Sequence, residues 1–110
     1  MTLPNAEAAH VDREKLRRYL LSETHPIGRS KAKFFRGIGF NEANIAVFEK
    51  SLIEMAQTEE VAETVTTRHG TKYVVEGVVT APSGNRVGLR TVWIVDKGQD
   101  TPRFVTAYPI

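Results

Sequence analysis

Cysteine is absent from this chain of 110 residues, which excludes disulfide bonds, thiolate metal ligands and a cysteine nucleophile. No apolar run approaches the roughly 20 residues that a membrane-spanning helix needs. The first residues lack the basic start and apolar stretch of a secretion signal. We therefore expect a cytoplasmic protein without a membrane partner.

Metal and nucleotide motifs are also missing. The histidines at positions 10, 25 and 69 have no metal-ligand spacing, and the carboxylates of the second half form no compact cluster. Gly37-Ile38-Gly39 is not followed by the third glycine of a dinucleotide fingerprint, and there is no P-loop. We expect neither a metal nor a cofactor.

The excess of positive over negative charge is small, because the formal net charge is only +2. The positive charge is nevertheless clustered. Residues 25–40 include no acidic side chain and four basic ones, which are Arg29, Lys31, Lys33 and Arg36. This segment gives the protein a local cationic field that suits an anionic partner.

The length and composition predict one globular domain, since 41% of the residues are apolar and 25% are charged. Residues 1–10 show no periodicity and are predicted to be a frayed N-terminal segment. Residues 11–110 form the predicted domain.

About three helices are predicted in the first half of the chain. Asp12 can cap a helix over residues 13–22, and Pro26 and Gly28 separate it from a second helix that ends at Gly37. Asn41 can cap a third helix that reaches residue 57. Its buried stripe consists of Ile45, Phe48, Leu52, Met55 and Ala56.

After residue 60 the hydrophobic period becomes strand-like and β-branched residues dominate. Four strands are predicted over residues 61–68, 72–80, 86–96 and 103–108. The connections between them are too short for parallel crossovers, so consecutive strands form antiparallel hairpins. The predicted fold class is α+β, with the helices packed on a four-stranded antiparallel β-meander.

The segment from His25 to Lys33 is the first candidate site. It places a histidine close to Arg29, Lys31 and Lys33, just before a helix start whose free N–H groups favour anions. A phosphate group could bind there. In the alternative interpretation, His25 caps a turn and the cations solvate a helix face.

The second candidate site lies on the last two strands, where Arg90 and Thr91 neighbour Thr106 and Tyr108 in the predicted meander. Arginine can hold a phosphate with two hydrogen bonds, and threonine and tyrosine hydroxyls can donate further ones. The alternative is cross-strand packing of these residues on an exposed edge.

The chain resembles a family of small bacterial proteins of unknown function over about residues 11–109. The motifs that carry this resemblance are His25-Pro26-x-Gly28-x-x-Lys31-Ala32-x-Phe34-Phe35, Arg90-Thr91-Val92-Trp93 and Pro102-Arg103-Phe104-Val105-Thr106-Ala107-Tyr108-Pro109.

The layout also resembles, more weakly, the superfamily of barnase-, EndoU-, colicin- and RelE-type ribonuclease toxins. That resemblance implies metal-independent RNA cleavage in which a ribose 2′-hydroxyl attacks the adjacent phosphate. His25 would then be a general acid or base, while Lys31 and Arg90 would stabilise the developing negative charge. Thr106 and Tyr108 would position the phosphate or protonate the leaving oxygen. The substrate would also contact Arg29, Lys33, Thr91 and Arg103.

These residues are consistent with two functions. The first is an RNA-cleaving, toxin-like enzyme with RNA and a cognate inhibitor protein as partners. The second is a non-catalytic interaction module that forms one half of a two-gene pair.

Overall fold

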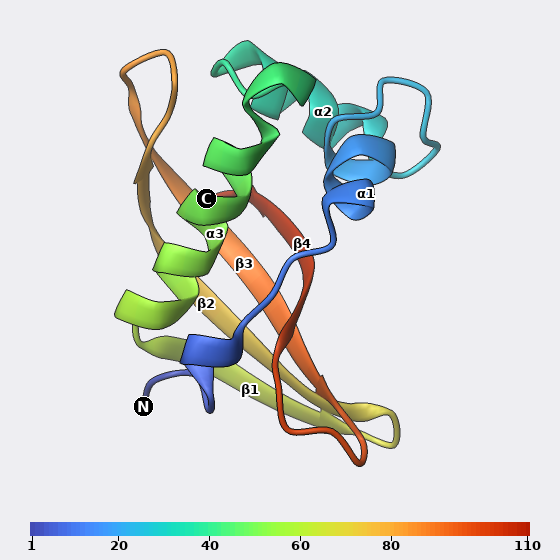
Figure 1. Ribbon diagram of the computed structural model, residues 1–110, viewed down its shortest axis with the longest axis vertical. Helices are drawn as coiled ribbons and strands as arrows, with labels where there is room; N and C mark the ends of the chain where they lie inside the picture. The colour runs from blue at the N-terminus through green and yellow to red at the C-terminus, as the bar shows by residue number, and fades with distance from the viewer.

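A computed structural model describes residues 1–110 and places the helices before a single antiparallel sheet, as predicted (Figure 1). The first half contains the 3-10 turn η1 (Ala6–Ala8), α1 (Arg13–Lys15), the π-helical turn η2 (Leu16–Leu20) and α2 (Arg29–Gly37). It continues with the 3-10 turn η3 (Glu42–Asn44) and α3 (Ile45–Thr58). No helix is long and apolar enough to cross a membrane.

The helix caps follow the sequence signals. The Asp12 side chain accepts a hydrogen bond from the backbone N–H of Glu14 at 2.9 Å, and Asn41 forms a capping box with Asn44. The helix predicted over residues 13–22 is shorter, however. It widens into η2, where the Leu21 N–H donates to the Leu16 carbonyl at 2.8 Å, and it ends there.

The sheet is a meander in the order β1-β2-β3-β4, formed by Val61–Thr67, Gly70–Thr80, Arg86–Asp96 and Arg103–Pro109. All neighbours are antiparallel. The α+β fold class and the meander are therefore confirmed.

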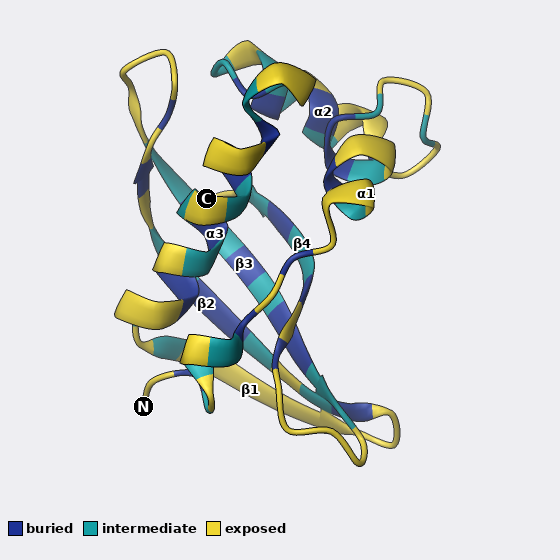
Figure 2. Cartoon of the chain, in the orientation of Figure 1, coloured by how far each residue is buried: buried dark blue, intermediate teal, exposed yellow.

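The core lies between α3 and one face of the sheet. Figure 2 shows buried residues recurring along β3, while β1 is exposed along most of its length. Leu89, Trp93, Phe104 and Ala107 belong to this core and are all at least 98% buried. Because side chains alternate across a strand, Arg90 and Val92 lie on the opposite face, which we call the outer face.

A β-bulge in β4 sets which residues reach the outer face. Val92 pairs with Thr106 and Trp93 pairs with Phe104, so Val105 is the extra residue of the bulge. Phe104 and Ala107 therefore both face the core although they are three residues apart. Thr106 and Tyr108 take the outer side.

The first ten residues differ from the frayed segment that the sequence suggests. Leu3 and Ala9 are buried in the core. The His10 N–H donates to the Pro102 carbonyl at 3.1 Å, and the Phe104 N–H donates to the His10 carbonyl at 3.0 Å. The buried side chains of Leu3 and Ala9 and this backbone pairing hold the segment against the sheet.

Candidate functional site

The candidate site lies where η2 and the start of α2 meet β4. The Tyr19 hydroxyl, from η2, accepts a hydrogen bond from the Lys31 ammonium of α2 at 2.8 Å. It also lies 3.2 Å from the Thr106 hydroxyl of β4. Tyr19 therefore connects the cationic segment to the sheet.

An open pocket of about 390 Å³ surrounds this contact and has no carboxylate in its lining, which consists of Lys15, Tyr19, His25, Val105 and Thr106. The Lys31 ammonium lies 5.2 Å from the centre of the Tyr19 ring. Two lysines beside a pocket without carboxylates favour an anionic ligand.

Two side chains at the pocket have altered protonation equilibria. Burial and, next, the charge of Arg103 lower the pKa of Lys15. Burial opposes ionisation of Tyr19. The hydrogen bonds with Lys31 and Thr106 and the charges of Lys31 and Lys15 outweigh it, and they hold the pKa of Tyr19 below its ordinary value.

His25 lies edge-on to Tyr19, with 5.1 Å between the ring centres. Its Nδ1 accepts hydrogen bonds from the backbone N–H groups of Ile27 at 3.1 Å and Gly28 at 2.9 Å. The Nδ1 lone pair is thus occupied, and the proton of the neutral ring lies on Nε2. This arrangement suits a hydrogen-bond donor and leaves no free ring nitrogen for a general base.

Arg90 and Tyr108 lie next to this pocket on the outer face. They pair across β3 and β4, and Tyr108 is two residues from Thr106 along β4, which corresponds to about 7 Å. The Tyr108 hydroxyl and then the Glu76 carboxylate hold the pKa of Arg90 above its ordinary value. The Arg90 Nε lies 3.1 Å from the Glu76 carboxylate, but its N–H is not aimed at it, so the contact is an ion pair without a hydrogen bond.

The structure therefore brings the two candidate sites of the sequence together at Thr106. His25, Lys31 and Thr106 share one cluster, and Arg90 and Tyr108 continue from it along the outer face.

The residues expected to contact the substrate are more scattered. Arg29 and Lys33 are exposed and line a second pocket on α2. Arg103 is exposed and makes a two-pronged ion pair with Asp96, at 2.6 and 3.0 Å. Thr91 is fully buried on the core face, where its hydroxyl donates to the Val75 carbonyl at 2.7 Å and accepts from the indole N–H of Trp93 at 3.0 Å.

Tyr19 and Lys15 are the residues of this cluster that sequence reasoning did not single out. Tyr19 follows the apolar spacing of a helix with Leu16 and Leu20, which is typical of a residue that faces the core. The feature of the sequence that could have indicated a polar role is the Tyr19 hydroxyl, because the hydroxyl of a half-buried tyrosine usually has a hydrogen-bond partner.

The fold and the site define a small α+β domain with a helical segment on one face of an antiparallel meander and a polar site at its last strand. The chain belongs to the family described as a domain of unknown function (DUF6883), whose model matches residues 2–110. The resemblance to a family of unknown function is thereby confirmed. No curated protein matches the sequence.

A solved structure shares the fold. It is a chain of the contact-dependent growth inhibition toxin - immunity protein complex from Klebsiella pneumoniae 342, with a TM-score of 0.72 and 20% sequence identity. The match covers 94% of this chain and 95% of that chain.

Proposed function

We propose that this domain is a toxin-like, metal-independent endoribonuclease whose active site is centred on Thr106. The observation that carries the proposal is the hydrogen-bonded series from Lys31 through Tyr19 to Thr106, which joins the cationic segment to the outer face. Similarity to a chain of a toxin–immunity complex supports the toxin-like class.

RNA supplies its own nucleophile, so the protein needs to hold the phosphate, stabilise added negative charge and protonate the leaving oxygen. Lys31 and Arg90 are the cations placed for the phosphate oxygens, and the Nε2–H of His25 is a third donor beside the pocket. Each donor aimed at developing charge contributes about 10²–10³ in rate when it is preorganised.

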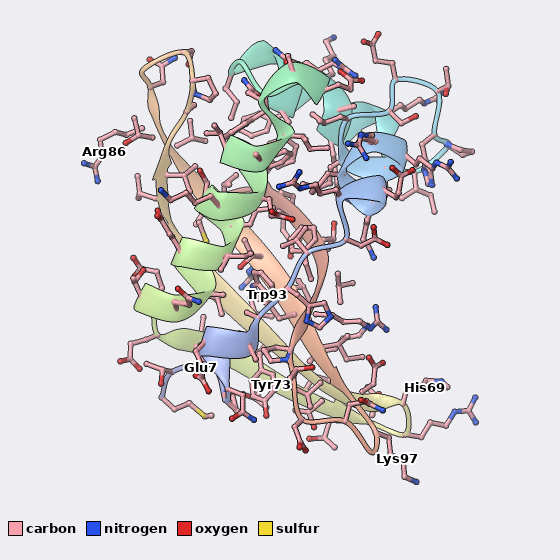
Figure 3. All side chains as sticks on the ribbon, viewed as in Figure 1. Glu7, His69, Tyr73, Arg86, Trp93 and Lys97 are labelled. Atoms are coloured by element: carbon pink, nitrogen blue, oxygen red, sulfur yellow. The ribbon has the colours of Figure 1, made fainter.

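The direct test is cleavage of total RNA and tRNA by the purified protein in EDTA. We expect cleavage that leaves 2′,3′-cyclic phosphate ends, and a loss of at least about 100-fold in rate for Lys31→Ala and for Arg90→Ala. Lys97→Ala is the matched control, because Lys97 is exposed in the distant β3–β4 turn (Figure 3). Wild-type activity no higher than that of a His25→Ala, Arg90→Ala double variant would refute the proposed endoribonuclease activity.

Arg29 and Lys33 are proposed to bind the RNA backbone next to the active site. Both are exposed and form no ion pair, whereas their neighbour Arg36 is held by Glu23 and Glu42. The Arg29→Gln, Lys33→Gln variant should raise KM without changing kcat. It should also reduce the slope of log affinity against log salt by about 1.4, if each cation contacts one phosphate of a single strand.

The control for these cations is the Arg68→Gln, Arg86→Gln variant, which removes the same charge from exposed positions at the two ends of the sheet. Arg68 is next to His69 in the sequence. Figure 3 shows Arg86 at one end of the sheet and His69 in a turn at the other end. An equal change in the salt slope for both double variants would show a general charge effect and would remove Arg29 and Lys33 from the binding site.

The second candidate is a non-catalytic module that binds a partner protein through the same polar surface. It is favoured by the similarity to a chain of a toxin–immunity complex. Co-expression with the product of the adjacent gene tests it. A stoichiometric complex that Lys31→Glu disrupts, formed by a domain without RNA cleavage, would support this function over the enzyme.

A further inference from the structure

Tyr19 has the geometry of a proton carrier and not only that of a core residue. Its ring packs against the core, while its hydroxyl reaches the pocket between Lys31 and Thr106. The Lys31 ammonium can only donate, so one lone pair of the phenol oxygen is already engaged. The phenol proton is left free to point to Thr106 or to a ligand in the pocket.

Burial of the phenol opposes its ionisation, but the hydrogen bonds and charges around it outweigh burial and lower its pKa. Lys31 on α2 and Lys15 on α1 are the charges that act on Tyr19, and both stabilise a phenolate. His25 faces the ring from the loop before α2, and Val105 and Thr106 face the pocket from β4 without adding charge. Asp12 and Arg103 act on Lys15 with opposite signs. A phenol in this setting is a stronger acid than a free tyrosine, because its pKa is lowered.

His25 does not compete for this role. Its Nδ1 is engaged by two backbone N–H groups, and the Nε2–H of the neutral ring is a poor proton donor compared with a phenol whose anion is stabilised.

We propose that Tyr19 is the general acid of RNA cleavage and gives its proton to the leaving 5′-oxygen. This inference rests on the proposed function. The 2′-oxygen forms a bond to phosphorus and loses its proton to a solvent base. The bond between phosphorus and the 5′-oxygen breaks, and that oxygen keeps the electron pair and takes the Tyr19 proton. Lys31 and Lys15 stabilise the phenolate until water reprotonates it.

The test compares two leaving groups at one mapped cleavage site. On ordinary RNA, Tyr19→Phe should lower the cleavage rate by about 10²–10⁴-fold, the range for loss of a general acid. On RNA with a bridging 5′-sulfur at the same site, the thiolate leaves without a proton. The Tyr19→Phe defect should then shrink to less than about 10-fold. Melting curves of both proteins check that the variant is folded.

A second variant, which keeps the Tyr19 hydroxyl, tests the role of Tyr19 through the pH dependence of kcat/KM. In the wild type, the slope of log kcat/KM against pH should fall by one unit at the Tyr19 pKa, which is lowered by the lysines. Lys31→Met removes one of them, so this bend should move to higher pH. A bend that stays in place contradicts the assignment.

The outcomes separate the two proposals. No cleavage of ordinary RNA by the wild type refutes the proposed function. Cleavage with an equal Tyr19→Phe defect on both leaving groups leaves the ribonuclease in place and overturns Tyr19 as the acid.

Discussion

Replacing Gly28 with alanine should destabilise the domain and weaken its site. Gly28 has an ordinary backbone conformation, but an added Cβ would lie 2.1 Å from the carbonyl oxygen of Tyr19 and 2.8 Å from its ring Cδ1. The two segments therefore have to move apart, and such overpacking costs about 1–3 kcal/mol. Denaturant unfolding should show this loss. The proposed RNA cleavage should fall as well, because His25 and Tyr19 are held by this contact.

Gly37→Ala is the matched control for this substitution. Gly37 ends α2, and an added Cβ there would meet no atom within 4 Å apart from its chain neighbours and the backbone of its own helix. Alanine has the higher helix propensity, so this variant should be neutral or more stable by up to about 1 kcal/mol. Equal stability of the two alanine variants would contradict the close packing of Gly28 on Tyr19.

Replacing Thr91 with valine should lower the free energy of unfolding while leaving the site intact. The hydroxyl bridges the Val75 carbonyl and the Trp93 indole inside the core. Each buried polar group left unpaired costs about 1–3 kcal/mol. Tryptophan fluorescence during urea unfolding measures the loss, and cleavage per folded molecule should be unchanged because Thr91 has no exposed surface.

Thr91→Ser keeps the hydroxyl and removes one methyl group, so its cost should be limited to about 1 kcal/mol. A Thr91→Val protein with wild-type stability and lost RNA affinity would instead support the substrate contact expected from sequence.

Much of this architecture could be predicted from the chain because local signals agree with the final packing. The strand limits follow from turn residues and alternation, and the Arg90–Tyr108 neighbourhood follows from a meander with short connections. The meeting of the two candidate sites does not follow from these local signals. It depends on how η2 approaches β4, and no local pattern encodes that approach.

Two features of the site were hidden from sequence for definite reasons. Alternation alone cannot tell which face of β3 meets the helices, so Thr91 could be assigned to the site although it lies in the core. The apolar spacing of Tyr19 with Leu20 concealed a hydroxyl that points out of the core. Both features depend on side-chain direction and not on element type.

The bulge at Val105 also decides where β4 tolerates a change of length. Without Val105, Phe104 and Thr106 would be consecutive and would still pair with Trp93 and Val92, so Thr106 and Tyr108 would keep the outer face. Loss of Ala107, from the regular part of the strand, would instead put Thr106 and Tyr108 next to each other and turn one of them toward the core. A single-codon deletion at Val105 is therefore a local event that removes the bend of the bulge, whereas the same deletion at Ala107 takes a hydroxyl of β4 out of the site.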